Sequence, residues 1–311
     1  MAASCETQLA KVRFRCGGAN TIARHRIPVD RIQIEEAIER IGELPTLPSV
    51  LGKILNTAAD PDASALDLGE HITTDQSLSA TLLKLVNSAF YGFHRQITSV
   101  TQAIVILGFL EVRNLALTAT AFRTLDTGAT DYDRVQLWRH SLASAMAADA
   151  IKKKLGEPIE GAFEAGLLHD IGKVVLDMLY PEIFVQAARQ AHAESRTIAD
   201  VLKERVGIDH AEVGGLLAEH WELPPAVVAA IRYHLRPEEA PEASKLIYVA
   251  AAANALTYPA GLGESSNGTP LEVPESAREA LGLNGATETA VIEKLLESKE
   301  NIDEFLGALA R

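Results

Sequence analysis

The eight residues from Gly166 to Lys173 bring together side chains able to do metal chemistry within an otherwise apolar run. His169 and Asp170 supply an imidazole and a carboxylate, a combination that suits zinc, iron or manganese. On a helix, Asp170 and Lys173 share a face, while Gly166 and Gly172 each weaken that helix by about 1 kcal/mol relative to alanine. Such glycines indicate close backbone approach or a functional reason. The alternative is a buried helix whose His-Asp pair is hydrogen-bonded for structural reasons.

A further histidine, His140, lies in a long predicted helix from about residue 135 to 155. Small side chains recur on its face of that helix, which would let a neighbouring helix approach closely. The Gly166–Lys173 stretch falls in the next predicted helix, about 160–179. His140 and the His169–Asp170 pair thus lie on consecutive predicted helices.

Two more histidines stand at predicted helix ends. Asp209 is a good N-cap, and Glu212 three residues later completes a capping-box pattern, which places His210 in the first turn of a helix. A break at 223–225, which contains two prolines, precedes a helix that carries His234. We therefore predict that these side chains, with the His-Asp pair and the histidine of the long helix, converge in one pocket.

Composition limits the class of protein. The chain has 311 residues, is 47% hydrophobic and carries a net charge of −13. It can bury one large or two small cores, and its negative field disfavours nucleic acid as a direct partner. Cys5 and Cys16 are too few and too close together for a disulfide framework. The sequence shows no apolar run of about 18 residues and no signal peptide, so we expect a cytoplasmic protein without membrane contact.

The chain reads as helices throughout, because no alternating strand pattern or hairpin signal occurs. Residues 1–28 lack periodicity and are predicted to be a mobile tail. A polar stretch at 127–133 marks a boundary between two helical lobes. After a Gly/Ser/Asn linker at 261–269, two amphipathic helices near 274–283 and 287–309 end the chain.

Seven stretches, in order between about residues 40 and 235, together resemble the HDOD domain, an HD-related output module of bacterial signalling. They are Leu44–Pro48, Asp75–Leu78, Leu85–Ser88, Ala103–Gly108, Gly166–Gly172, Asp209–Gly214 and Trp221–Pro224. The resemblance implies an all-α, two-lobed fold: an HDOD domain at 29–258, with an N-terminal lobe at 29–127 and an HD-like lobe at 128–258. The linker and C-terminal helices would then occupy 259–311.

The same resemblance implies a divalent metal site of the HD phosphohydrolase superfamily, holding iron, manganese, zinc or nickel. Its ligands would be His140, His169, Asp170, His210, His234 and Asn254. Asn254 stands where HD enzymes have an aspartate, and an amide oxygen lacks the charge that such cations favour. Lys173 would stabilise phosphate charge only if the chain is an enzyme.

Family members generally act as non-catalytic regulatory modules, often coupled to two-component or cyclic-di-GMP systems. We therefore expect a non-catalytic signal-transduction module that works through protein contacts with such signalling proteins, and the flanks are too short for a receiver, cyclase or kinase segment. A vestigial metal or nucleotide pocket could remain. The alternative is a metal-dependent phosphohydrolase acting on a nucleotide or cyclic dinucleotide.

Overall fold

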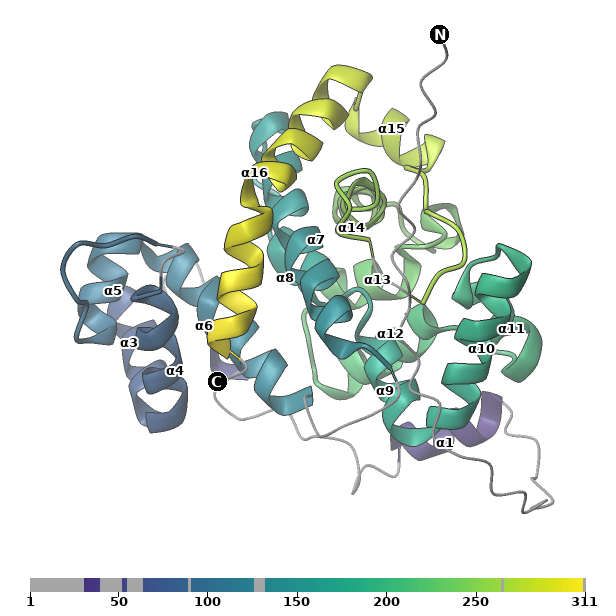
Figure 1. The fold of residues 1–311 in the computed structure, drawn as a ribbon, viewed down its shortest axis with the longest axis horizontal. Coiled ribbons are helices and arrows are strands. Elements are labelled where there is room, and N and C mark those ends of the chain that lie inside the picture. The colour runs from purple at the N-terminus through teal and green to yellow at the C-terminus, as the bar shows by residue number, and fades with distance from the viewer. Residues whose placement is uncertain are drawn as a thin grey trace, which may run out of the picture.

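The computed structural model describes residues 31–39, 52–54, 64–88, 91–125, 132–263 and 266–309. Across these ranges every regular element is a helix, which confirms the all-α prediction (Figure 1). The predicted tail at 1–28 and the Leu44–Pro48 motif lie outside the described residues.

The N-terminal lobe is a group of short helices joined by tight caps. They are α3 (Ala65–Thr74), α4 (Gln76–Val86), α5 (Val100–Leu107) and α6 (Phe109–Leu125). Ser64 forms a capping box with Asp67, and Asp75 caps α4, as their sequence positions predict. Gly108 turns the chain between α5 and α6 at φ 90°, a conformation that favours glycine. The lobe lies at the left of Figure 1.

The Ser64 cap offers a test of this local structure. Ser64→Ala removes the acceptor for the Asp67 backbone N–H and is expected to lower the free energy of unfolding by about 1 kcal/mol. Chemical denaturation of the whole chain measures the loss. Ser77→Ala, an exposed change in the next helix, should stay within about 0.5 kcal/mol of the parent. Equal stability of the two variants would contradict the capping role.

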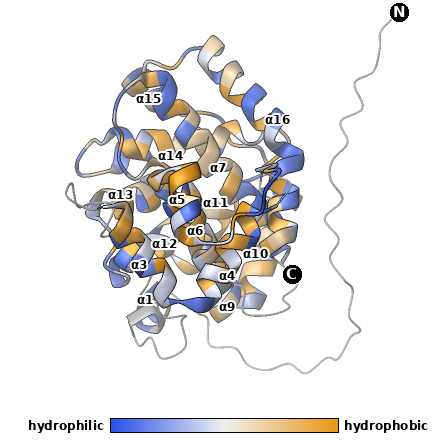
Figure 2. Cartoon of the chain, turned by 90° about the vertical axis from the view of Figure 1, so that its left-hand side faces the viewer, coloured by the Kyte–Doolittle hydropathy of each residue, from blue (hydrophilic) through white to orange (hydrophobic). Residues whose placement is uncertain are grey.

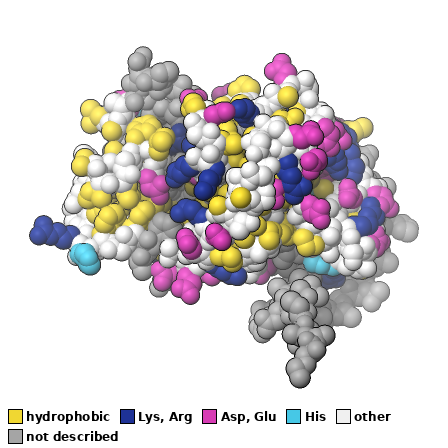
Figure 3. Space-filling view, turned by 90° about the horizontal axis from the view of Figure 1, so that it is seen from above, with side chains coloured by type: hydrophobic (Ala, Val, Ile, Leu, Met, Phe, Trp, Pro, Cys, Tyr) yellow, Lys and Arg dark blue, Asp and Glu magenta, His cyan; other side chains and the backbone are white. Residues whose placement is uncertain are grey.

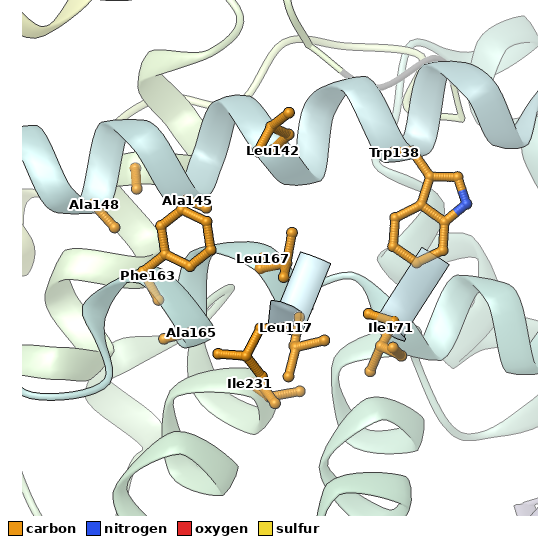
Figure 4. Close-up of a cluster of buried hydrophobic side chains, with 14 of the residues drawn as sticks. Leu117, Trp138, Leu142, Ala145, Ala148, Phe163, Ala165, Leu167, Ile171 and Ile231 are labelled. Carbon is orange, nitrogen blue, oxygen red and sulfur yellow. The ribbon is translucent and has the colours of Figure 1, made fainter. Parts of the chain in front are cut away.

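The HD-like lobe is a larger group of packed helices. Its helices are α7 (Arg134–Leu155), α8 (Ala162–Leu168), α9 (Ile171–Leu179), α10 (Pro181–Glu194), α11 (Ile198–Val206), α12 (His210–His220), α13 (Pro225–Tyr233), the 3₁₀ turn η1 (Pro237–Glu239) and α14 (Lys245–Leu256). The helix α7 packs against α8 and α14, and α12 packs against α9 and α13. Among these helices lies an apolar core, in which Trp138 and Leu142 of α7 face Phe163, Leu167 and Ile171 (Figure 4).

One predicted element is wrong in detail. The single helix expected at 160–179 is two helices, α8 and α9, separated by a turn at His169 and Asp170. Asp170 has φ −97° and ψ 11°, outside the helical region, so α9 leaves in a new direction and packs on α12. Glycines on both sides of the break lie close to other backbones: a Cβ on Gly166 would lie 2.6 Å from the Ser144 carbonyl oxygen, and one on Gly172 would lie 1.9 Å from that of His210.

Two segments at the ends of the chain pack against the HD-like lobe. The helices α15 (Glu275–Leu281) and α16 (Gly285–Leu309) follow α14, and α16 runs along α7 while touching α4 of the N-terminal lobe. At the other end of the chain, α1 (Arg31–Glu39) packs on α12. Arg31 there donates to Glu212 at 2.8 Å. The first described helix, although within the 29–127 span, is therefore attached to the HD-like lobe.

Apolar and polar segments alternate along the helices of both lobes (Figure 2). Among the helices that the structure describes, none combines the length and the apolar character needed to cross a membrane.

Candidate metal centre

Five side chains from four places in the HD-like lobe meet at its centre. His140 comes from the N-terminal half of α7, and His169 and Asp170 form the turn between α8 and α9. His210 is the first residue of α12, and His234 caps the C-terminus of α13. Each is at most 2% exposed. The structure therefore brings these five residues together at one site, where the sequence predicted that they would converge.

Asp170 lies between two pairs of histidines. Its Oδ2 is 3.4 Å from Nε2 of both His140 and His169. Its Oδ1 is 3.1 Å from Nε2 of His210 and 3.7 Å from Nε2 of His234. The five residues thus form two triplets of possible ligands, each containing two imidazoles and both sharing this one carboxylate.

Backbone carbonyl groups set the orientation of three of these imidazole rings. Nδ1 of His169 lies 2.8 Å from the Gly166 carbonyl oxygen, and Nδ1 of His234 lies 2.8 Å from that of Ile231. Because a carbonyl can only accept, each Nδ1 carries the proton and each Nε2 keeps a lone pair that faces inward. His140 follows the same rule, with its Nδ1 3.2 Å from the Leu262 carbonyl oxygen.

The consequence is clearest between His140 and His169. Their two Nε2 atoms lie 3.1 Å apart, so two lone pairs face each other at contact distance. A cation or a proton must lie between them to offset the repulsion. Two nitrogens bound to one ion at about 2.1 Å would lie about 3.0–3.4 Å apart, which agrees with the observed separation.

Burial favours the neutral imidazoles of His140 and His234, and nearby positive charge favours the ionised carboxylate of Asp170. Burial lowers the pKa of His140 and holds the pKa of His234 well below its usual value. Burial alone would raise the pKa of Asp170, but the Lys173 ammonium, helped by His169 and His140, holds that pKa well below its usual range. Lys173 itself is 1% exposed, and its Nζ donates to Asp170 Oδ2 at 2.7 Å.

These residues fit a divalent metal ion. Several buried ligand atoms make no hydrogen bond within the described part of the chain: Asp170 Oδ1, His234 Nε2, Asn254 Oδ1 and both ring nitrogens of His210. Leaving such atoms unsatisfied costs about 1–3 kcal/mol each, whereas a metal ion at the centre would engage those that face Asp170, including Nε2 of His210 and of His234. Imidazole nitrogens and a carboxylate suit iron, zinc, nickel or manganese.

Asn254 lies near the end of α14, where it is 3% exposed. Its backbone carbonyl accepts from Thr257 Oγ1 at 2.7 Å, and that same hydroxyl lies 3.1 Å from His140 Nδ1. The predicted position therefore belongs to the helix end that covers the His140 ring. An amide contributes no negative charge there.

Sequence reasoning missed the groups that contact the His140 ring on the side of its Nδ1 atom. Thr257 is one helical turn after Asn254, so its spacing could have pointed to it. The Leu262 carbonyl could not have been found, because a backbone contact across more than a hundred residues leaves no side-chain signal. The Tyr258 ring also packs edge-on against His140, with ring centroids 5.9 Å apart.

A family model described as the HDOD domain matches residues 44–237. The chain belongs to the HDOD domain family. The matched span contains all five converging residues and ends before Asn254, α15 and α16. The predicted resemblance is thereby confirmed.

Similar proteins agree with this assignment. An uncharacterized protein from Treponema pallidum (strain Nichols) is 35% identical over 222 residues, which cover 70% of this chain but only 42% of that protein. An HDOD domain protein of unknown function from Geobacter sulfurreducens has a TM-score of 0.75 and is 27% identical, covering 88% of this chain and 98% of its own. A candidate phosphohydrolase from Shewanella amazonensis SB2B shares the fold, with a TM-score of 0.68 and 23% identity over 89% of this chain and 97% of its own. The two solved structures therefore share the fold of this chain.

Proposed function

We propose that this chain is a non-catalytic regulatory HDOD module whose HD-type centre holds a divalent metal ion that stabilises the lobe. The observation that carries the proposal is burial: the four histidines, Asp170 and Asn254 are each at most 3% exposed. A hydrolytic metal site keeps an open position that water and substrate can reach. A phosphate ester has no such approach to ligands that are covered on every side.

Lys173 supports the same conclusion. A lysine that neutralises substrate phosphate must present its ammonium to the substrate. Here the ammonium is buried and donates to Asp170, the carboxylate common to both ligand triplets. The lysine therefore fits the role of a charge that compensates Asp170 inside the core.

Regulation through protein contacts is supported by an apolar patch on the N-terminal lobe. Val105, Ile106 and Leu110 flank the α5–α6 corner and are 80%, 47% and 57% exposed. Hydrophobic side chains gather at that end of the molecule (Figure 3). Grouped exposed apolar side chains commonly mark surfaces that bind other proteins. A component of a bacterial signalling system is the partner class that we propose.

The position of Asp170 favours a second candidate, a metal-dependent phosphohydrolase. Each of its oxygens faces a different pair of histidines, so each pair would hold a metal ion together with Asp170, and such an ion would supply an activated water for hydrolysis. The number of bound ions and the presence of turnover separate the two candidates.

The test uses protein purified without a His-tag. We expect about one metal ion per chain by elemental analysis, and no hydrolysis of cyclic-di-GMP or bis(4-nitrophenyl) phosphate with added manganese, iron or nickel. Asn254→Asp should tighten the binding of that ion, so that more chelator is needed to remove it, because the variant restores a charged oxygen at the α14 position. Two ions per chain with turnover of about 1 per second or more would establish the hydrolase instead.

A further inference from the structure

A second internal space lies away from the metal centre. A cavity of about 480 Å³ opens between α6 of the N-terminal lobe, α7 and α8 of the HD-like lobe, and the C-terminal helix α16. Its volume falls in the range of small-molecule sites, about 300–1,000 Å³. None of the proposed metal ligands lines it.

The inner wall of the cavity is apolar. Leu115, Leu142, Phe163, Val291 and Phe305 line it, and each is at most 9% exposed. These side chains come from all four helices that enclose the space. These apolar side chains offer no hydrogen-bond partner to a polar group, so they favour a ligand whose buried part is aliphatic or aromatic.

The outer edge of the cavity is cationic. Lys153, Lys154 and Lys294 line it, and all three are exposed, so they mark the side that faces solvent. None of them forms an ion pair with a residue that the structure describes. Lys and Arg side chains are visible beside the hydrophobic end of the molecule in Figure 3. The chain has a net charge of −13, so a group of three lysines around one cavity is a local exception to its overall negative charge.

The two acids that line the cavity are already engaged. Glu111 accepts from the Tyr91 hydroxyl at 2.8 Å, and Asp149 lies 3.3 Å from Nζ of Lys152. Neither carboxylate therefore forms an ion pair with any of the three lysines. The uncompensated charge at the mouth is positive, which complements an anion.

A polar side chain in the wall adds a donor. Asn114 is 7% exposed, and its Oδ1 accepts from Arg113 at 3.3 Å. Its amide nitrogen donates to no other described residue. A ligand oxygen inside the cavity could accept from it.

We propose that this cavity binds an amphipathic organic anion, with an aliphatic or aryl body against the apolar wall and a carboxylate, sulfate or phosphate group at the lysines. The site is a property of this chain beyond its family match, because α16 supplies one wall and lies outside residues 44–237. The ligand would touch helices of both lobes, including α7, which carries His140.

Isothermal titration with dodecanoate below its micelle concentration tests the proposal on the full chain. We expect one molecule to bind per chain, with weaker binding at higher salt because the lysines are exposed. Butyrate keeps the headgroup but lacks the body, and dodecyltrimethylammonium keeps the body but reverses the charge. Both should bind at least about tenfold more weakly. Equal affinity for the cationic and anionic probes, or uptake of many molecules per chain, would overturn the proposal.

Variants locate the bound probe. Replacing the three lysines together, K153Q with K154Q and K294Q, should weaken dodecanoate binding about tenfold, since each exposed pair contributes modestly. Lys84→Gln, an exposed change on α4, is the matched control and should leave affinity unchanged. Met146→Trp places bulk among the lining residues and should block binding while the metal content stays the same. Unchanged binding in the triple variant would overturn the site.

Discussion

The Asp170→Asn variant is expected to carry no bound metal ion and to lose about 3–5 kcal/mol of stability. Both triplets of possible ligands share this carboxylate, so its neutralisation removes the charge from each of them at once. The change also removes the negative charge that compensates the buried Lys173 ammonium, 2.7 Å away. The thermal midpoint should fall by about 6–20 °C, at about 2–4 °C per kcal/mol for a chain of this size.

Chelation separates the metal contribution from the ion-pair contribution. Removing metal from the parent protein should lower its thermal midpoint, because an ion that binds only the folded state stabilises it. The same treatment should leave Asp170→Asn unchanged. Asp303→Asn is the matched control: Asp303 is half exposed and pairs with Arg139 on the surface, so about 1 kcal/mol or less is expected. Parent-like metal content in Asp170→Asn would refute the ligand assignment.

Gly172→Ala is expected to cost about 3 kcal/mol, although alanine is normally the better helix former. The added Cβ would lie 1.9 Å from the His210 carbonyl oxygen and 2.6 Å from the Gly214 nitrogen. Both atoms are backbone, so no side chain can turn away, and α9 must separate from α12. This movement would displace His210 from Asp170 and lower metal occupancy as well as stability.

Gly307→Ala provides the control for this substitution. Gly307 lies in α16, and a Cβ there would meet no atom within 4 Å. The variant should be as stable as the parent or up to about 1 kcal/mol more stable. Thermal unfolding and elemental analysis of the two variants measure both effects. A Gly172→Ala protein that melts within about 2 °C of the parent would show that the two helices are not tightly packed.

Local features of this chain could be predicted because their physical causes are local. Ser64, Asp75 and Asp209 cap helices, since each side-chain oxygen reaches a backbone N–H two or three residues later. The long helix at 135–155 and the two C-terminal helices follow from apolar periodicity. The order of the motifs, together with the HDOD resemblance, identified the family and the residues that meet at the centre.

Tertiary structure alone decided how those residues meet. The turn at His169 and Asp170 interrupts a run that the sequence predicts as one helix, and on either side of it Gly166 and Gly172 lie close to backbones elsewhere in the chain. That turn places Asp170 between two pairs of histidines instead of on one helix face. The Leu262 carbonyl, which orients His140, is a group that every residue possesses. Such contacts join chain segments far apart in sequence: the glycines indicate that another backbone comes close, but residue types and spacing do not say which one.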